Sequence, residues 1–180
     1  STAEPQNYRP ISLLNSVAKV LDSIVARRLS RFLRNEDVIV SDQFGFVHGR
    51  STVDQLIHLT ASAAKSMDSS QEYDVVFLDF AKAFDRVPHS TLLALLQPLC
   101  NPTATTWFAG YLEARKLQVK VGEDLSPIAP ISAGVPQGSH LGPILFLLYI
   151  NTLPRSIPDG NRTETYLYAD DTDDTISNGG

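Results

Sequence analysis

Three carboxylates stand at the ends of two apolar runs, in a pattern suited to binding metal ions. Asp170 and Asp171 follow the apolar residues 166–168, and Asp79 ends a much earlier run over residues 73–78. Two strands that each bring a carboxylate to one sheet edge form a cluster of hard oxygen donors, which suits Mg²⁺ bound to substrate phosphates. A pair of such ions promotes phosphoryl or nucleotidyl transfer. The spacing therefore predicts a two-metal site built from these three acids.

Side-chain alternation along a strand ranks the candidates. Asp170 is expected to share a strand face with the two tyrosines before it, so it is the firmer ligand, and Asp171 joins it only if a tight turn begins there. The alternative for each acid is structural, because aspartate also caps turns and forms Asx turns. Asp85 is a further candidate ligand. Asp79 is preferred because it ends a strand, and Asp85 is expected to brace the following turn.

A glycine-containing loop, residues 134–142, leads into an apolar stretch. Gly134 and Gly138 let the backbone approach a ligand closely, and the N-terminus of the helix expected to follow favours an anion. The loop lacks the sequence of a phosphate-binding P-loop and the spacing of a nucleophile elbow, so an ordinary loop-to-helix turn is the alternative. The four histidines show no metal-ligand spacing, and a single cysteine cannot build a zinc site.

Hydrophobic periodicity and the positions of Gly and Pro predict the elements that position these residues. Helices are expected over residues 16–34, 52–66, 90–97, 103–114 and 141–153, and strands over residues 73–80, 117–121, 127–132 and 163–168. The strand at 73–80 and the helix at 141–153 are apolar enough to be predicted as buried. Helices mixed with hairpins predict an α+β fold, in which helices cover an antiparallel sheet.

The composition indicates a globular chain. Of its 180 residues, 43% are apolar and 19% charged, which allows one domain with a core. Cys100 is the single cysteine, which favours a reducing compartment. No leader-like segment opens the chain and its longest apolar run is too short to span a bilayer, so a soluble intracellular protein with no membrane partner is expected. The net charge of −5 argues weakly against a nucleic-acid partner, although residues 1–50 are net basic.

Five segments resemble the ordered motifs of reverse transcriptases. Residues 8–14 (YRPISLL) and 43–52 (QFGFVHGRST) resemble two fingers motifs, and residues 77–85 (FLDFAKAFD), 134–143 (GVPQGSHLGP) and 168–171 (YADD) are similar to polymerase motifs A, B and C. Their order and spacing are also those of the family. The residues in these motifs are most similar to those of non-LTR retrotransposons of the jockey-like type. The resemblance spans nearly the whole chain, and the full ordered set makes it specific.

The resemblance implies a right-hand polymerase. Its helical fingers portion would cover residues 1–72, and its palm portion, with fingers segments interleaved, residues 73–180. The implied activity is that of an RNA-directed DNA polymerase, a nucleotidyltransferase that moves dNMP from a dNTP to the 3′-OH of a DNA primer on an RNA template. The thumb and endonuclease of such a polyprotein are expected to be missing from this chain, so the piece alone is expected to be a poor enzyme.

For the metal site, the resemblance implies that Asp79 and Asp170 hold two Mg²⁺ ions, with Mn²⁺ as the alternative cofactor. Asp171 would assist them, and the backbone carbonyl of Phe80 would add a ligand.

For the substrate, the resemblance implies roles for four further residues. Phe84 falls at the aromatic steric gate that excludes a 2′-OH. Gln137 would lie beside the incoming nucleotide and template, with Gly138 in the same substrate-binding loop. Arg9 would grip the triphosphate, whose phosphoryl oxygens match an arginine fork.

Several positions depart from the family's pattern. Val47 and His140 stand where relatives usually carry arginine and a small aliphatic residue, and residues 1–7 lack the usual Lys-Pro segment. Residues 172–175 (TDDT) replace an apolar stretch, which leaves open whether the return strand of the motif C hairpin forms. Val47 and the altered segment after Asp171 favour a second hypothesis, a catalytically dead palm relic that binds RNA or a protein as a scaffold. A third hypothesis, a two-metal nucleotide cyclase, is opposed by the long helical N-terminal section.

Overall fold

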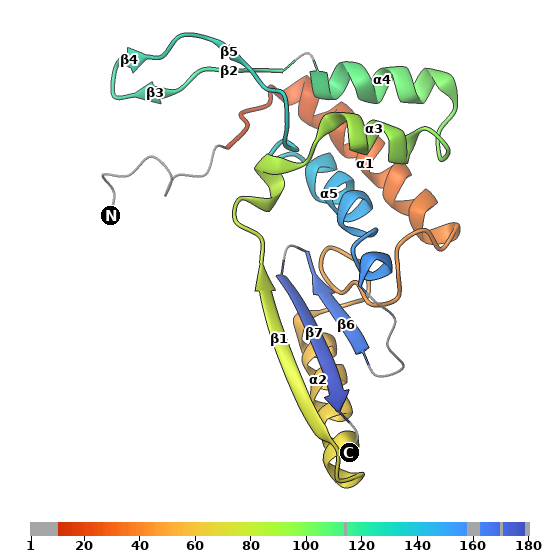
Figure 1. Cartoon of the computed structure of the whole chain (residues 1–180). Helices are drawn as coiled ribbons and strands as arrows, with labels where there is room; N and C mark the ends of the chain where they lie inside the picture. The colour runs from red at the N-terminus through yellow and green to blue at the C-terminus, as the bar shows by residue number, and fades with distance from the viewer. Residues whose placement is uncertain (1–10, 114, 158–162, 170, 179–180) are drawn as a thin grey trace.

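The computed structural model describes residues 11–113, 115–157, 163–169 and 171–178, which form a helical part and a three-stranded sheet (Figure 1). The helices are α1 (Ser16–Asn35), α2 (Thr52–Asp68), α3 (His89–Leu96), α4 (Pro102–Glu113) and α5 (Leu141–Ile150), with short 3₁₀ turns at Ala83–Arg86 and Pro154–Ser156. The strands are β1 (Glu72–Asp79), β2 (Lys116–Leu117), β3 (Lys120–Val121), β4 (Asp124–Leu125), β5 (Ala129–Pro130), β6 (Thr163–Tyr168) and β7 (Asp171–Asn178). The predicted α+β class is confirmed. None of the described helices is long and apolar enough to cross a bilayer.

Side-chain caps explain where the first two helices begin. Asn15 Oδ1 accepts a hydrogen bond from Ala18 N at 2.8 Å, at the start of α1. Ser51 Oγ accepts from Asp54 N at 3.2 Å and donates to Asp54 Oδ2 at 2.7 Å, at the start of α2. These bonds satisfy backbone donors that a helix start otherwise leaves free. Both helices begin where the sequence predicts and run slightly further.

Helix α5 forms the centre of the helical part. It is apolar all round, as a helix enclosed by others must be, and most of its residues are buried. Helices α1 and α3 both contact α5, and α4 packs against α3 (Figure 1). The helix predicted over residues 141–153 ends at Ile150. Asn151 follows it, and its side chain accepts from Val40 N at 2.7 Å and donates to Val38 O at 2.8 Å.

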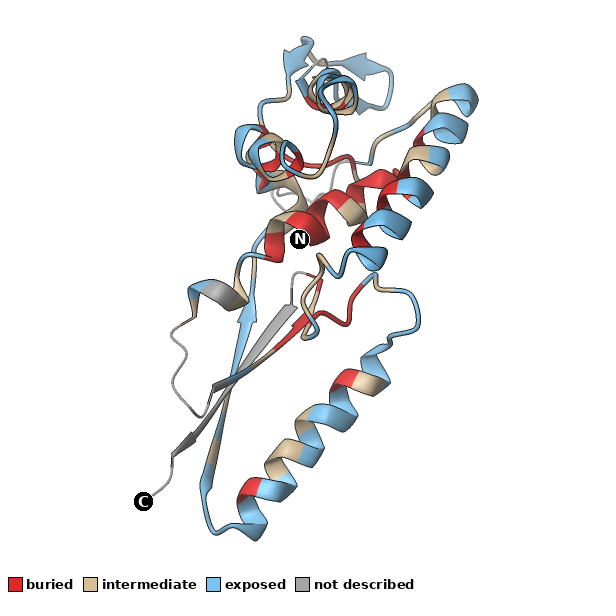
Figure 2. Cartoon of the chain, turned by 90° about the vertical axis from the view of Figure 1, so that its right-hand side faces the viewer, coloured by how far each residue is buried: buried red, intermediate tan, exposed pale blue. Residues whose placement is uncertain are grey.

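The sheet has three antiparallel strands in the order β1-β7-β6. Strand β7 pairs with β1 from Glu72↔Asn178 to Asp79↔Asp171, and with β6 from Thr163↔Ile176 to Tyr168↔Asp171. The return strand therefore forms despite its acidic residues, because a central strand satisfies its backbone groups on both sides. Helix α2 contacts β1 and β6 and lies against one face of this sheet (Figures 1 and 2).

The prediction that the apolar strand at 73–80 is buried is wrong. In β1, Tyr73 and Val75 are only half-buried, and Val76, Leu78 and Phe77 are exposed, Phe77 by 71% (Figure 2). Helix α2 contacts β1 from one side, and β1 has a single strand neighbour among the described residues. The apolar run therefore belongs to a strand of which only one face is partly covered. A strand covered on both faces would bury every side chain.

The hairpin predicted over residues 117–132 forms in two short pieces. Strand β2 pairs with β5, and β3 pairs with β4 around Gly122, whose φ is +61°. Between the pieces, Ser126 Oγ accepts from Val119 N at 3.0 Å, and Ser126 N donates to Val119 O at 2.9 Å. The serine side chain thus takes a backbone donor that a regular ladder would use, which explains why each strand is shorter than predicted.

Candidate active site

Strands β1 and β7 bring two of the candidate acids to the same end of the sheet. Asp79, the last residue of β1, is the register partner of Asp171, the first residue of β7. Opposed Cα atoms in an antiparallel pair lie about 4.5–5.5 Å apart. The Asp79 side chain is exposed, and the described residues form no ion pair with it. Two acidic positions therefore meet here, whereas Asp170 and Arg9 lie outside the described residues.

A strained residue follows β6. Ala169 has a φ of +57°, a left-handed conformation that costs a residue other than glycine about 1–2 kcal/mol. Residues 42–45 run beside this point: Leu167 N donates to Asp42 O at 2.9 Å, and Phe44 N donates to Leu167 O at 2.8 Å. Only two residues, 169 and 170, separate β6 from β7. The tight turn on which a role for Asp171 depends is therefore present.

The glycine loop docks on the 3₁₀ turn that follows β1. Gly134 N donates to Val87 O and Val135 N donates to Phe84 O, both at 2.8 Å. Gly134 has a φ of +96°, and a Cβ there would lie 2.9 Å from Asp85 O. Only glycine fits both the conformation and the contact. Segments that are far apart in the sequence, and that resemble motifs A and B, thus form one packed unit.

Gln137 and Asp85 face each other across this contact. Gln137 Nε2 donates to Asp85 Oδ1 at 3.2 Å, and Gln137 O accepts from Ser12 N at 2.8 Å. Asp85 therefore braces the glycine loop, whereas the sequence predicted that it would brace the turn that follows it. Gly138 is exposed with a φ of +90°, so its backbone is open to a ligand. The first fingers segment, the turn after β1 and the glycine loop are joined at Gln137.

Phe84 is held by two other aromatic rings. It stacks on Phe146 of α5, with ring centroids 4.4 Å apart and planes inclined by 16°, and it meets the edge of Phe46 at 6.1 Å. Stacked and edge-to-face pairs stabilise a ring beyond its burial. Phe84 is only half-buried, so part of a rigidly held ring remains available to a substrate.

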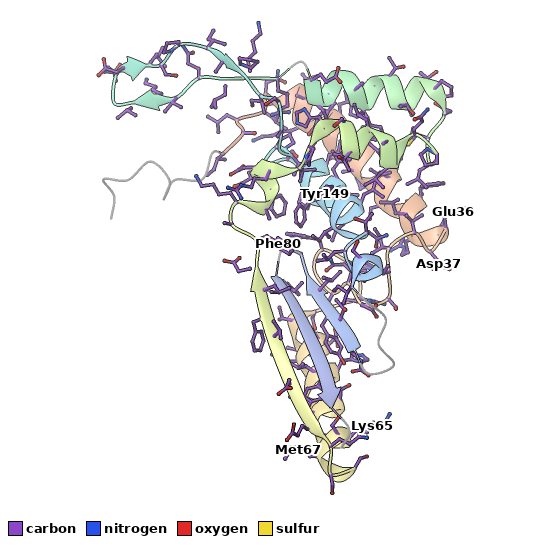
Figure 3. The ribbon with its side chains drawn as sticks, viewed as in Figure 1. Glu36, Asp37, Lys65, Met67, Phe80 and Tyr149 are labelled. Carbon is purple, nitrogen blue, oxygen red and sulfur yellow. The ribbon has the colours of Figure 1, made fainter. Side chains whose placement is uncertain are left out.

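Phe80 lies at the junction of β1 and the helical core. It is half-buried against the core, and together with Tyr149 it lines a cavity of about 470 Å³ (Figure 3). Its carbonyl accepts from Ala83 N at 3.1 Å. A carbonyl oxygen has two lone pairs, so this hydrogen bond leaves one for a metal ion.

A cationic cavity of about 540 Å³ opens beside Gln137. Its walls come from residues 11–13, the turn after β1, residues 115–118 and the glycine loop. Lys82, Arg115 and Lys116 line it, and Arg115 lies 5.5 Å from the ring centroid of Tyr111. The Asp85 carboxylate also lines the cavity, so its charged lining is three cations and one acid. The three cations and the Gln137 amide are well matched to phosphate oxygens. Of the residues with implied substrate roles, Gln137 lines this cavity, and Lys82, Arg115 and Lys116 are lining residues that the sequence analysis did not single out.

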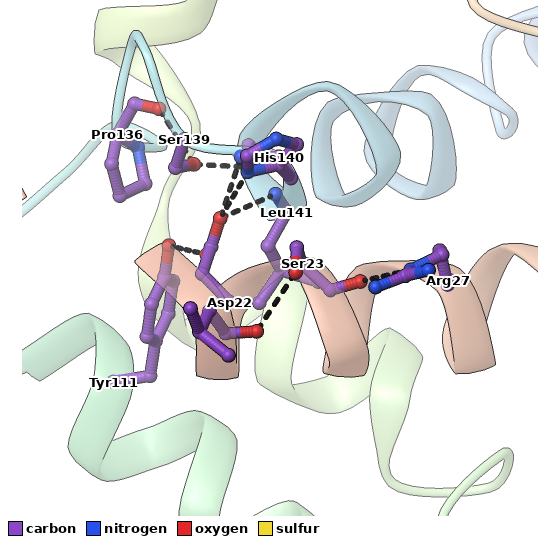
Figure 4. Close-up of polar contacts among 10 residues, drawn as sticks. Asp22, Ser23, Arg27, Tyr111, Pro136, Ser139, His140 and Leu141 are labelled. Carbon is purple, nitrogen blue, oxygen red and sulfur yellow. Dashed lines mark hydrogen bonds and ion pairs between the residues drawn. The ribbon is translucent and has the colours of Figure 1, made fainter. Parts of the chain in front are cut away.

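The N-terminus of α5 is capped by a buried carboxylate that the sequence analysis missed. Asp22 of α1 is 2% exposed, and its Oδ2 accepts from His140 N at 2.6 Å and from Leu141 N at 3.3 Å (Figure 4). Its Oδ1 accepts from Tyr111 Oη at 2.9 Å. His140 Nδ1 lies 3.5 Å from the same carboxylate. The anion predicted at this helix start is therefore a side chain of the protein itself.

The position of Asp22 along α1 could have revealed from the sequence that its carboxylate is buried and hydrogen-bonded. Asp22 shares the buried helix face with Ala26, Leu29 and Leu33, at helical spacing. A carboxylate on such a face must have hydrogen-bond donors. Burial is the main cause that raises the pKa of the Tyr111 hydroxyl to about 12, so this donor stays protonated over the neutral range.

In the part of the chain that the structure describes, no three His, Cys, Asp or Glu side chains gather to hold a metal ion. Of the three predicted carboxylates, Asp79 alone has a described side chain. An exposed carboxylate that has no ion-pair partner among the described residues, opposite a second acidic position, fits a hard divalent cation.

Comparison with known proteins identifies the family. The model of the reverse transcriptase (RNA-dependent DNA polymerase) family matches residues 2–176. The probable RNA-directed DNA polymerase from transposon BS of Drosophila melanogaster is 36% identical over 171 residues, which are 93% of this chain and 19% of that protein. The RNA-directed DNA polymerase from mobile element jockey of the same species is 36% identical over 170 residues, 92% of this chain and 19% of that protein.

Solved structures agree on the fold. Telomerase from Candida tropicalis in complex with the TWJ fragment of telomeric RNA has a TM-score of 0.64 and 13% sequence identity, covering 91% of this chain and 29% of that chain. The apo enzyme of that species, truncated from its C-terminal domain, gives a TM-score of 0.63 over 88% of this chain and 34% of that chain. The chain spans about a fifth of the length of the transposon relatives. It has a right-hand polymerase fold and belongs to the reverse transcriptase (RNA-dependent DNA polymerase) family, among the jockey-like non-LTR retrotransposon members.

Proposed function

We propose that this chain forms the fingers and palm of an RNA-directed DNA polymerase, with residues 1–72 in the fingers and residues 73–180 mainly in the palm. The observation that carries the proposal is the register of Asp79 against Asp171 at one end of the sheet. A reverse transcriptase domain requires a nucleic-acid template and primer, and the relatives are RNA-directed DNA polymerases. An RNA template, a DNA primer and dNTPs are therefore the proposed partners and substrates.

The acids at the sheet end would hold the cofactor. Reverse transcriptases generally use divalent metal ions, and the candidate ligands are Asp79, Asp170, Asp171 and the Phe80 carbonyl. When bound, two Mg²⁺ or Mn²⁺ ions lower the pKa of the primer 3′-OH and stabilise the leaving pyrophosphate. The protein contributes by fixing the strands that carry these ligands, through the β1–β7 and β6–β7 pairing.

Other residues would bind and select the nucleotide. Lys82, Arg115 and Lys116 give the cavity the charge that a triphosphate requires, and Gln137 is fixed at its wall by Asp85. Outside the described residues, Arg9 is proposed as a further phosphate ligand. The Phe84 ring, immobilised on the aromatic ring beneath it, is proposed to exclude a ribonucleotide by contact with its 2′-OH. Gly138 is exposed beside these groups, so its backbone is accessible to a nucleotide.

Metal-dependent nucleotide binding and primer extension test the proposal. Asp79→Asn keeps the size of the side chain but removes its charge, so we expect Mg²⁺-dependent dNTP binding to weaken. Primer extension should fall by about 100-fold or more, as for loss of a group that stabilises transition-state charge. The control is Asp124→Asn, an exposed acid in the β3–β4 hairpin, which should leave both unchanged. Template-directed extension by Asp79→Asn at the wild-type rate would refute the proposed site.

The relic hypothesis has lost one of its two supports. It rested on Val47 and on doubt over the strand after Asp171, and β7 pairs along both its edges. RNA binding by the wild-type chain, with no Mg²⁺-dependent dNTP binding, would favour it over the enzyme.

A further inference from the structure

The Gln43 side chain connects residues 42–45 to Ala169, the residue directly before Asp170 and Asp171 (the acidic pair). Gln43 is 1% exposed. Its Oε1 accepts from Gly45 N at 2.8 Å and from Ala169 N at 3.1 Å. Ala169 is itself 4% exposed, so its N–H cannot rely on solvent for an acceptor. Gln43 therefore supplies the hydrogen bond that a strained, buried turn residue lacks.

The backbone around Gln43 is fitted to the same turn. A Cβ on Gly45 would lie 2.3 Å from Ala169 N and 2.9 Å from the carbonyl carbon of Tyr168. The segment forms a parallel bridge with β6 at Gln43↔Leu167. Glycine at position 45 thus lets the segment approach closely enough for the Gln43 amide to reach Ala169.

The other end of the Gln43 amide finds no acceptor in the part of the chain that the structure describes. Gln43 Nε2 is buried and has no hydrogen-bond partner in the described structure, which is unfavourable for a polar group. Asn151 is the informative contrast, because both ends of its buried amide are bonded to backbone. Methionine at position 43 would fill similar space with no unsatisfied donor. A half-satisfied amide at this position therefore indicates a specific requirement for its Oε1.

We infer that Gln43 is a positioning residue that holds Ala169 in its left-handed conformation and thereby sets the metal affinity of the acidic pair that follows. Successive residues of an extended strand point to opposite faces, so the direction in which the chain leaves Tyr168 decides which acids can serve one site. Groups that orient metal ligands typically change metal affinity by about 10–100-fold when they are removed. The inference rests on the proposed function of the acidic cluster.

Metal binding without turnover tests this role. Binding of Mn²⁺ to the chain is measured from the EPR signal of the free ion, for the wild type, Gln43→Met, Asn151→Leu and Asp79→Ala. We expect Asp79→Ala to abolish the binding and Gln43→Met to weaken it by about 10-fold or more. Asn151→Leu also removes two hydrogen bonds from a buried amide and lowers the melting temperature, but it should leave Mn²⁺ affinity unchanged.

Two further measurements address the turn directly. Amide hydrogen exchange at Ala169 should be slow in the wild type and in Asn151→Leu, and fast in Gln43→Met. Adding Ala169→Gly to Gln43→Met should restore part of the Mn²⁺ affinity, because glycine adopts a positive φ without support. If Gln43→Met does not fold, Gln43→Asn replaces it, since the shorter side chain keeps the polarity but cannot reach both N–H groups.

The possible outcomes separate this inference from the proposed function. If the wild type binds Mn²⁺ through Asp79 and the Gln43 variants bind it equally well, or no worse than Asn151→Leu, the positioning role is refuted and the metal site stands. If the wild type shows no Asp79-dependent Mn²⁺ binding, the proposed function fails and the inference fails with it.

Discussion

Replacing Asp22 by alanine should lower the free energy of unfolding by about 3 kcal/mol. The change leaves His140 N, Leu141 N and the Tyr111 hydroxyl without their acceptor. A buried donor left unsatisfied costs about 1–3 kcal/mol, and loss of a helix cap about 0.5–2 kcal/mol. For one unsatisfied donor and one lost cap these ranges sum to about 1.5–5 kcal/mol. We take a value near the middle and do not count all three donors in full, because the Leu141 contact is long at 3.3 Å and water can reach the exposed His140.

Urea denaturation monitored by circular dichroism measures this effect. For a chain of this size, the change corresponds to a fall in melting temperature of roughly 6–12 °C. Tyr111→Phe is the matched control: it removes one donor and no charge, and should cost about 1 kcal/mol. A loss below about 1 kcal/mol for Asp22→Ala, or equal losses for the two variants, would show that the carboxylate does not anchor α5 as the hydrogen bonds indicate.

Three further predictions follow from packing and ionisation. Gly134→Ala should destabilise the chain by roughly 1–3 kcal/mol in urea titrations, because position 134 has a positive φ and a Cβ there would contact Asp85 O. The control Gly110→Ala, in a helix with open space around it, should stabilise the chain by about 0.5–1 kcal/mol. Equal effects of the two substitutions would contradict the contact. Since the pKa of Tyr111 in the folded state is raised to about 12 from 10, its contribution to stability is complete below pH 10 and is lost as pH rises through 12, so the wild type should lose more stability than Tyr111→Phe between pH 9 and 12; parallel losses would disprove it. Phe84→Val should raise rNTP incorporation relative to dNTP in primer extension and cost about 1–3 kcal/mol in stability through the lost ring stack, and unchanged sugar discrimination would argue against a steric gate.

Local signals in the sequence located most elements. Helix α1 was predicted over 16–34 and runs from Ser16 to Asn35, because the apolar spacing that predicts it lies within the segment itself. Strand β6 matches its prediction over 163–168 for the same reason. The sequence predicted that these acids meet at one edge of a sheet, but the pairing of Asp79 with Asp171 joins distant segments, and no local pattern predicted that register.

Features that depend on tertiary partners were missed or misjudged. The exposure of β1 depends on what lies against it, and an apolar run alone does not show this. Asp22 carried a signal, a carboxylate on a buried helix face, but its partners Tyr111 and His140 lie far along the chain. Ala169 gave no warning of its positive φ, because turns of this geometry usually carry Gly or Asn.

The outer position of β1 has a consequence for handling the isolated chain. Among the described strands β1 bonds only to β7, so one row of its N–H and C=O groups is unpaired by any of them. The exposed apolar side chains of Val76, Phe77 and Leu78 lie along the same strand. An open row of this kind is a template on which extended segments of other molecules add, and such growth propagates into fibrils or amorphous precipitate. Lysine at position 76 or 78 should act as a gatekeeper and keep concentrated samples monodisperse.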